Sequence, residues 1–473
     1  MTDGNNQIPE AVERVHLIAA CGTAMGALAC ILKDSGIAVT GSDEHVYPPM
    51  STFLASRGIH LLDGFHPDHL TPAPDLVVVG NTVKSDNPEA RRLRELGLPY
   101  CSLPQALNRF LVGEKRALVV TGTHGKTTTS SLLAWMLYRA GMEPSFMIGG
   151  ILKDFDSNYR LGSGGVAVLE GDEYDTAYFD KGPKFIHFRP AVAILTSVEF
   201  DHADIYRDLD HVCEAFSRFV GEMHRESLLV ACHGDANITR VLSGARCRVE
   251  SYGNDDGAHW RIADVSVTPP WTLFSLYCRK DLFGRFRSPM LGRHNVSNAA
   301  AVIAVGAELG LTAPAMAAAL ETFSGVRRRQ EIRGRRRGVT VMDDFAHHPT
   351  AVRETIAAVR PHATGGRLIA VFEPRTNSSM RQVFQAVYPT VFDGADLVCI
   401  RRPSALHKVP EAQRMSSERL VADLQRRGLD ARHFEETGAI IDFLANACRP
   451  GDTVLIMSNG GFDNIHERLL AAL

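Results

Sequence analysis

The chain has 473 residues, which is enough for about three domains with substantial cores. Hydrophobic residues make up 45% and charged residues 22% of the sequence, as is typical of a globular protein. The formal net charge of −3 creates no overall field that would attract nucleic acid or an anionic membrane, so the composition excludes both as principal partners.

The N-terminal segment and the cysteines favour a cytoplasmic protein. Residues 1–14 are polar and partly acidic, unlike a secretory leader. The apolar stretch 17–32 is shorter than the ~20 residues that a membrane span needs and contains three turn residues, Gly22, Thr23 and Gly26. The nine cysteines are odd in number and form no C-x-x-C pair, which favours reduced thiols over disulfides or a zinc site.

The first segment, residues 1–114, is predicted to be a Rossmann-like domain. Strands are expected at residues 15–20, 38–40 and 76–79, with a helix ending near Leu32. Such repetition with short connections is typical of a parallel sheet. The turn at residues 21–26 departs from G-x-G-x-x-G, yet it can bind a nucleotide, with Asp43 available to a ribose or sugar hydroxyl. The alternative is a tight turn without a ligand.

The middle segment, residues 115–325, opens with the sharpest motif of the chain. After an expected strand at 117–120 comes Gly122-Thr123-His124-Gly125-Lys126-Thr127-Thr128, followed by a helical pattern at 132–137. A loop of this kind directs N–H groups at a polyphosphate. Lys126 can reach the β- and γ-phosphates and Thr127 can bind Mg²⁺. The spacing differs from G-x-x-x-x-G-K-[ST], and the alternative is a plain helix-capping turn.

Two acidic clusters follow expected strands in the middle segment. Glu170 and Glu173 lie just beyond the strand at 166–169, and His202 lies in the acidic stretch 199–204 beyond the strand at 193–196. Carboxylates and one imidazole beside a phosphate loop suit Mg²⁺ that bridges ATP and a substrate carboxylate. The choice between Glu170 and Glu173 stays open, and each cluster alone is also compatible with a solvated loop.

The end of the middle segment offers groups for a base and for phosphate. Asn295 and Asn298 lie one turn apart on an alanine-rich helix and can bind a base or ribose. Short strands are expected between residues 248 and 290. The arginines at 327–329 are interpreted as cations beside a transferring phosphoryl group rather than as a nucleic-acid patch. The basic stretch 326–337 is predicted to be a hinge or linker.

The third segment, residues 326–473, is predicted to be a second Rossmann-like domain. Its expected strands are at 339–342, 368–372, 397–400 and 453–457, and its expected helices at 349–359, 380–391 and 416–426. Polar groups follow three of these strands: residues 343–349, Glu373-Pro374-Arg375 and Ser458-Asn459-Gly460-Gly461. These strand ends share one edge of a parallel sheet, where ligands usually bind. Small residues such as 458–461 can form an anion-binding nest.

With these residues assembled, the chain resembles the Mur ligase family of peptidoglycan assembly. The resemblance covers nearly the whole length in matching order, and it rests on residues 121–128, 199–202, 292–298 and 343–349. Asn87-Pro88 and the turn at 22–26 look like the branch that uses UDP-N-acetylmuramate. Residues 173–175, 178–181 and 457–462 resemble the members that attach L-alanyl-γ-D-glutamyl-meso-diaminopimelate in murein recycling more than those that add L-alanine.

The resemblance implies three α/β domains and a role for each cluster. ATP would phosphorylate the lactyl carboxylate of UDP-N-acetylmuramate, and the amine of a murein tripeptide would attack the acyl phosphate. The implied catalytic residues are Lys126, Glu173, His202, Arg328 and Arg329. The implied ATP-binding residues are Gly122, Thr123, His124, Gly125, Lys126, Thr127, Thr128, Asn295, Asn298 and Asp344. The implied Mg²⁺ ligands are Thr127, Glu170, Glu173 and His202.

The two outer segments would bind the sugar nucleotide and the peptide. The implied residues for the UDP-sugar are Gly22, Thr23, Met25, Gly26, Ser42, Asp43 and Asn81. Those for the peptide are His347, His348, Arg375, Ser458 and Asn459. The planar fork of Arg375 suits a peptide carboxylate, although it could instead pair with Glu373 or solvent. The oligomeric state is not predicted.

One departure from the family and three alternatives remain. Several members carry a carbamylated lysine on the helix after the His202 motif, but residues 209–223 contain no lysine, so a second metal ion is not predicted. The neighbouring alternative adds free L-alanine to the same acceptor. A P-loop switch protein would need no UDP-sugar, and an NAD-dependent dehydrogenase would have no use for Lys126 and Thr127.

Overall fold

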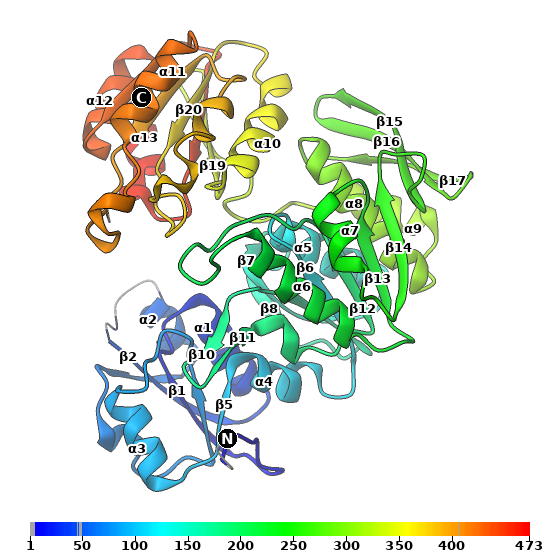
Figure 1. The fold of residues 1–473 in the computed structure, drawn as a ribbon, viewed down its shortest axis with the longest axis vertical. Helices are drawn as coiled ribbons and strands as arrows, with labels where there is room; N and C mark the ends of the chain where they lie inside the picture. The colour runs from blue at the N-terminus through cyan, green and yellow to red at the C-terminus, as the bar shows by residue number, and fades with distance from the viewer. Residues whose placement is uncertain (1–4, 45, 47–49, 405) are drawn as a thin grey trace.

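The computed structural model describes residues 5–44, 46, 50–404 and 406–473, so the first four residues of the polar N-terminal stretch lie outside it. Three α/β units follow one another along the chain, coloured blue, cyan to green, and yellow to red in Figure 1. Each is built on one main sheet, and most strand pairs are parallel. The predicted α/β fold class is confirmed. The boundaries predicted at 114 and 325 fall between successive main sheets.

The first unit is a five-stranded parallel sheet in the order β3-β2-β1-β4-β5. The apolar run Leu76–Val79 is buried on both faces because helices cover both. The elements are β1 (Arg14–Ile18), α1 (Thr23–Asp34), β2 (Ala38–Asp43), α2 (Met50–Ser56), β3 (His60–Asp63), β4 (Leu76–Val79), α3 (Pro88–Leu96), β5 (Tyr100–Ser102) and α4 (Leu103–Leu107), with single turns η1 (Pro67–Leu70) and η2 (Asn108–Val112).

The middle unit has a ten-stranded sheet in the order β17-β16-β15-β14-β13-β12-β6-β9-β7-β8. Its parallel centre supports the phosphate loop, and β15, β16 and β17 extend it as an antiparallel meander. The elements are β6 (Arg116–Thr121), α5 (Lys126–Arg139), β7 (Ser145–Leu152), β8 (Ser157–Arg160), β9 (Val166–Gly171), β10 (Asp175–Ala177), β11 (Asp180–Pro183), η3 (Lys184–His187), β12 (Val192–Leu195), α6 (Leu209–Glu222), β13 (Leu228–Cys232), α7 (Ala236–Leu242), β14 (Arg248–Gly253), β15 (Trp260–Thr268), β16 (Trp271–Cys278), β17 (Asp281–Ser288), α8 (Arg293–Glu308) and α9 (Ala313–Glu321).

The third unit is a six-stranded sheet in the order β18-β19-β23-β20-β21-β22, parallel except for the edge strand β18. Its elements are β18 (Glu331–Arg336), β19 (Val339–Asp344), α10 (Pro349–Val359), η4 (Arg360–His362), β20 (Leu368–Phe372), η5 (Gln382–Phe384), η6 (Tyr388–Thr390), β21 (Leu397–Arg401), η7 (Leu406–Lys408), η8 (Glu411–Gln413), α11 (Ser417–Arg426), β22 (Ala431–Phe434), α12 (Thr437–Ala447), β23 (Thr453–Met457), η9 (Phe462–Asn464) and α13 (Ile465–Ala472).

Two predicted elements of the third unit are wrong. The basic stretch 326–337 is not all linker, because Glu331–Arg336 pairs with β19 as a strand. The helix expected at 380–391 is only two 3-10 turns, η5 and η6. Pro389 lacks an N–H and disfavours the helical conformation at the residue before it. The Gln385 side chain instead accepts a hydrogen bond from the Ser416 amide at 2.8 Å.

A small hairpin ties the middle unit to the first. Strands β10 and β11 pair antiparallel, and the hairpin lies beside the first unit in Figure 1. At its tip, the Phe179 ring meets Tyr100 edge-on at a centroid distance of 4.8 Å. The Tyr178 hydroxyl accepts a hydrogen bond from Arg94 at 2.9 Å. The two aromatic side chains pack against the core of the first unit, so the hairpin fixes one unit against the other.

The parallel sheets bring the polar residues to shared edges. The segments that follow β6, β9 and β12 carry the phosphate loop, the Glu170–Glu173 stretch and the His202 stretch, and these three strands are neighbours in one sheet. In the third unit, the ends of β19, β20 and β23 are likewise adjacent. No helix in the described part of the chain is long and apolar enough to cross a membrane.

Candidate active site

The phosphate loop connects β6 to the N-terminus of α5. Gly122 has φ +128°, and a Cβ there would collide with Thr196 and the backbone of Ser197, so only glycine fits. The Ser197 hydroxyl accepts a hydrogen bond from the His124 amide at 2.9 Å, and the Ser197 carbonyl accepts one from the Thr123 amide at 2.9 Å. The loop is therefore held in shape by the segment after β12.

Lys126 lies at the mouth of this loop. Its ammonium group donates to the Gly122 carbonyl and to Glu173 Oε2, both at 2.7 Å. Burial alone opposes the charged form, but Glu173 and Asp172 outweigh it and raise the pKa of Lys126. The side chain therefore stays protonated, as a phosphate-binding lysine must be.

Thr127 and Glu170 form the second contact of the loop. The Thr127 hydroxyl donates to Glu170 Oε1 at 3.0 Å, and the Gly149 amide donates to Glu170 Oε2 at 2.8 Å. An Arg329 N–H reaches the Thr127 hydroxyl at 3.3 Å. Arg329 is thus placed beside the phosphate loop, as expected for a cation that faces phosphate.

Glu173 is a buried carboxylate that contacts two cations of the site. Its side chain is 2% exposed and lies between Lys126 and His202, whose Nε2 is 3.2 Å from Glu173 Oε1. Burial opposes the protonated imidazole, but the contact with Glu173 outweighs it and raises the pKa of His202 to about 9. Among the described residues, none makes a well-directed hydrogen bond to Glu173 Oε1.

These groups fit a hard divalent cation. Thr127, Glu170 and His202 line the same cavity beside the loop, and the buried Glu173 carboxylate lies behind them, 3.2 Å from His202 Nε2. Two carboxylates and a hydroxyl, with Glu173 Oε1 lacking a directed partner among the described residues, match the oxygen-rich ligand sets that Mg²⁺ prefers. Both glutamates lie close to the loop, so the geometry supports keeping both as candidate ligands.

A separate cavity of about 320 Å³ lies on the far side of the loop, between α8 and the third unit. Asn295 and Asn298 line it and are joined by a hydrogen bond of 3.1 Å. Asp344 closes it from β19, where its oxygens accept from the amides of Gln330 and Ala346 at 2.8 Å. Burial is the main cause that raises the pKa of Asp344. His124, Gly125 and Thr128 also line this cavity, which suits the nucleoside of ATP.

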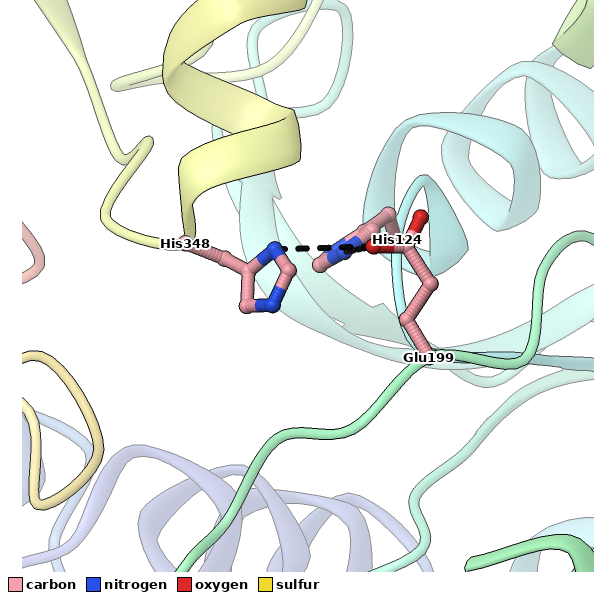
Figure 2. Close-up of side chains that lie close together, drawn as sticks. All are labelled: His124, Glu199 and His348. Carbon is pink, nitrogen blue, oxygen red and sulfur yellow. Dashed lines mark ion pairs between the residues drawn. The ribbon is translucent and has the colours of Figure 1, made fainter. Parts of the chain in front are cut away.

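His348 contacts His124 and Glu199, two residues that line this cavity, and its role toward the peptide stays a prediction. Figure 2 shows it pointing from the start of α10 toward Glu199 and His124. His348 Nδ1 is 3.8 Å from Glu199 Oε2, and His124 Nε2 is 3.6 Å from the same oxygen. Burial, reinforced by His124, lowers the pKa of His348 to about 4. The neutral ring therefore joins the third unit to the phosphate loop.

Two histidines with lowered pKa values predict a loss of stability in mild acid. Burial lowers the pKa of His294 to about 4, with Arg329 as a second cause, and His348 behaves alike. An unfolded histidine titrates near 6.5, so the stabilising difference is complete above that pH and is lost as pH falls toward 4. We expect a slope of about 1.4 kcal/mol per pH unit for each residue.

Thermal unfolding between pH 7.5 and 4.5 measures this loss. His294→Asn and His348→Asn should each flatten the fall in Tm relative to the wild type. His224→Asn is the matched control, because the His224 side chain is 74% exposed. An unchanged acid slope in both the His294 and the His348 variant would assign the loss to carboxylates instead.

Five of the seven predicted sugar-nucleotide residues line a cavity of about 610 Å³ in the first unit. Gly22, Thr23, Met25, Asp43 and Asn81 line it. Asp43 is also tied to the turn itself, because its Oδ2 accepts from the Cys21 amide at 2.8 Å. The Asp43 carboxylate therefore shapes the glycine turn as well as facing the cavity.

Ser42 and Gly26 do not line this cavity, which corrects both assignments. The Ser42 side chain points to the other face of the sheet, where its hydroxyl donates to the buried Glu89 at 2.6 Å. Gly26 lies under the turn, where a Cβ would meet Met50. Alternation along β2 explains the first error, because neighbouring strand residues face opposite sides.

The predicted peptide residues divide into two groups. Arg375 is exposed and lies on Gly460, where a Cβ would overlap the guanidinium group. No ion pair joins Arg375 to another described residue, and Glu373 pairs instead with Arg401. Ser458 is buried and donates to Glu373 at 2.7 Å, so it holds the 458–461 loop and does not face the solvent.

His347, Asn459 and Arg328 complete the third-unit side of the site. His347 lines the cavity at the phosphate loop, where its Nε2 is 3.7 Å from Asp201 Oδ2. Asn459 Oδ1 is buried without a hydrogen-bond partner among the described residues. Arg328 also lines the cavity at the phosphate loop, and it donates to the Ser458 and Gly460 carbonyls at 2.6 and 2.7 Å. It therefore holds the 458–461 loop, and its role as a phosphate cation stays a prediction.

Sequence reasoning missed several groups that the fold brings to the site. Gln330 and Thr350 line the nucleoside cavity, and Lys184 lines the cavities on both sides of the glycine turn. Only the proximity of Lys184 to the acidic stretch 170–173 in the chain gave a hint of its role. The contacts that place Gln330 and Thr350 come from distant segments and leave no local pattern.

Comparison with known proteins agrees with this geometry. Three family descriptions match: "Mur ligase family, catalytic domain" over residues 14–114, "Mur ligase middle domain" over 120–306 and "Mur ligase, glutamate ligase domain" over 328–460. This chain belongs to the Mur ligase family. The resemblance expected from the motifs is confirmed, and this Mur ligase is an ATP-dependent enzyme that forms C–N bonds.

Individual relatives span nearly the whole chain. The UDP-N-acetylmuramate–L-alanyl-γ-D-glutamyl-meso-2,6-diaminoheptandioate ligase of Escherichia coli is 36% identical to this Mur ligase, covering 97% of this chain and 98% of its own. The solved murein peptide ligase of Psychrobacter arcticus is 32% identical, with a TM-score of 0.72 and 98% coverage of both chains. The UDP-N-acetylmuramate–L-alanine ligase of Geotalea uraniireducens is 31% identical over 98% of both.

Proposed function

We propose that this Mur ligase joins L-alanyl-γ-D-glutamyl-meso-diaminopimelate to UDP-N-acetylmuramate in murein recycling, at the expense of ATP. One observation carries the proposal: the sugar-nucleotide cavity shares part of its lining with the cavity at the phosphate loop, and Lys126 and Arg329 line the latter. The 36% identity over the full length to a relative named for this reaction supports the choice of substrates.

The chemistry follows from the placement of the charges. A lactyl carboxylate oxygen attacks the γ-phosphorus of ATP, the bond to the β-γ bridging oxygen breaks, and ADP leaves. The amine of the peptide then attacks the acyl carbon, loses a proton and expels inorganic phosphate. Lys126 and Arg329 face the transferring group and stabilise the charge that develops on it. Mg²⁺ held by Thr127, Glu170, Glu173 and His202 would neutralise further phosphate charge.

Residues outside the phosphate loop position the nucleoside and the peptide. Asn295, Asn298 and Asp344 hold the nucleoside in the cavity beside α8. His347 and Arg375 would face the peptide, and the amide oxygen of Asn459 has no hydrogen-bond partner in the part of the chain that the structure describes. A cytoplasmic location belongs to this proposal, and the nine free cysteines support it, because thiols persist in a reducing compartment.

Addition of free L-alanine to the same acceptor is the second candidate, supported by the 31% identical L-alanine ligase. Phosphate release from ATP and UDP-N-acetylmuramate, measured with tripeptide and with L-alanine in parallel, separates the two. We expect the tripeptide to give the higher kcat/KM. A preference for L-alanine would overturn the substrate assignment. Phosphate release from ATP alone, without UDP-N-acetylmuramate, would indicate a nucleotide switch.

Arg375→Lys tests the peptide side of the proposal. The lysine keeps the charge but loses the planar fork that binds a carboxylate through two hydrogen bonds. We expect the KM for tripeptide to rise about 10-fold, as for the loss of one charged hydrogen bond. The KM values for ATP and UDP-N-acetylmuramate should stay nearly unchanged.

The matched control is Arg432→Lys. Arg432 lies on the same domain, where its guanidinium stacks on Phe443, away from the strand ends of the site. Gly460→Ala should mimic Arg375→Lys, because the added methyl group displaces the guanidinium from the 458–461 loop. Equal changes in all three KM values would instead assign Arg375 to domain closure.

A further inference from the structure

The sugar-nucleotide cavity and the phosphate-loop cavity share part of their lining. The first has a volume of about 610 Å³ and the second about 720 Å³. Four residues line both: Thr23, Ala24, Leu103 and Lys184. Lys184 is the charged member of this set. A substrate that extends from the first cavity into the second therefore passes a single cation at their junction.

Lys184 is held firmly at this junction. It is the first residue of η3, directly after the β10–β11 hairpin, and its amide donates to the Tyr174 carbonyl at 3.1 Å. Its side chain is 16% exposed, and its ammonium group lies 5.7 Å from the centre of the Tyr174 ring. The backbone contact and the ring fix the direction of a side chain that would otherwise be flexible.

The partner of Lys184 is shared with another cation. Lys184 Nζ donates to Asp172 Oδ2 at 2.6 Å. Lys126 is near enough to act on the same carboxylate electrostatically. Lys126 is also paired with Glu173, whereas Asp172 is the carboxylate that contacts Lys184. The Lys184 ammonium retains donors for an incoming anion, since an ammonium group has three.

We infer that Lys184 binds the reacting carboxylate of the acceptor sugar and guides it to the phosphate loop. The inference rests on the proposed function, in which the sugar nucleotide occupies the first cavity and its carboxylate must reach the γ-phosphate. Thr23 and Leu103 offer no charge at the junction. Lys184 thus acts on the acceptor, whereas Lys126 acts on ATP.

Two sugar nucleotides distinguish the carboxylate from the pyrophosphate. UDP-N-acetylglucosamine carries the same pyrophosphate as UDP-N-acetylmuramate but lacks the lactyl group. We expect Lys184→Met to weaken binding of UDP-N-acetylmuramate about 10-fold or more, the usual loss for a charged hydrogen bond. Binding of UDP-N-acetylglucosamine should stay within about twofold of the wild type. Calorimetry on the full-length protein measures both.

Three further variants serve as controls for the role of Lys184. Lys181→Met is the matched control, because Lys181 lies on the same hairpin, is 70% exposed and pairs with Asp175. Lys184→Arg should restore most of the affinity, since it returns a cation to the junction. Asp172→Asn removes the pair but keeps the cation, so it should leave the preference for the carboxylate intact. The KM for ATP and the Tm should stay near the wild-type values in Lys184→Met.

The outcomes separate this inference from the proposed function. Equal weakening of both sugar nucleotides would assign Lys184 to the pyrophosphate and overturn the inference. If Asp172→Asn loses the preference for UDP-N-acetylmuramate over UDP-N-acetylglucosamine as fully as Lys184→Met does, the Lys184–Asp172 pair is only structural. Wild-type protein that ligates the tripeptide, with unchanged binding in Lys184→Met, refutes the inference alone. Wild-type protein that fails to use UDP-N-acetylmuramate refutes the proposed function.

Discussion

Replacing Lys126 with alanine is expected to abolish ligation while the fold persists. Its ammonium group is held at the mouth of the phosphate loop by the Gly122 carbonyl and Glu173. In a water-poor site, such a fixed charge stabilises the transition state by several kcal/mol, so its loss should reduce kcat by about 10³-fold. Initial rates of phosphate release at saturating substrates measure the effect.

The control is Lys280→Ala, which removes an exposed lysine at the turn between β16 and β17. Circular dichroism and the melting curve should be close to the wild type for both variants, because His202 still faces the buried Glu173 in the Lys126 variant. Near-normal turnover of Lys126→Ala with a normal melting curve would refute the assignment of the phosphate loop.

Glu173→Gln should lower kcat and raise the Mg²⁺ concentration needed for half-maximal rate. The side chain is 2% exposed and contacts both Lys126 and His202, so neutralising it leaves two half-buried cations with less compensation. Loss of one such electrostatic partner typically costs about 10²- to 10³-fold in rate. A titration of Mg²⁺ against initial rate gives the two quantities separately.

The same Mg²⁺ titration is applied to Glu170→Gln and His202→Ala. Glu170 accepts from Thr127 and the Gly149 amide, so its variant tests whether the second carboxylate is the stronger ligand. We expect His202→Ala to shift the half-saturation in the same direction as Glu173→Gln. Unchanged Mg²⁺ half-saturation in all three variants would reduce these residues to structural members of their loops.

Local sequence patterns were enough to predict many of the candidate site residues. The phosphate loop was predictable because glycine spacing, a lysine and the flanking strand and helix all act within one short segment. Glu170, Glu173 and His202 were predictable because parallel strands deliver their ends to one edge. The same rule placed Asp344 and Arg375 at the edge of the third sheet.

The errors come from contacts between distant segments. Arg328 lies in a basic run that suggests phosphate, and its additional hydrogen bonds to the carbonyls of Ser458 and Gly460, more than a hundred residues along the chain, could not be predicted. His348 is adjacent to His347, yet it turns to Glu199 on another domain. Periodicity predicted a helix at 380–391, where Pro389 and the Gln385 side chain favour short turns. No local pattern encodes these choices.

The aromatic tip of the β10–β11 hairpin sets a rule for exchanging parts between relatives. The hairpin belongs to the middle domain in sequence, but Tyr178 and Phe179 pack against Arg94 and Tyr100 of the first. A chimera spliced near residue 114 would combine a foreign first domain with a tip shaped for the native one. The transferable module for acceptor choice is therefore discontinuous, comprising residues 1–114 together with residues 174–184.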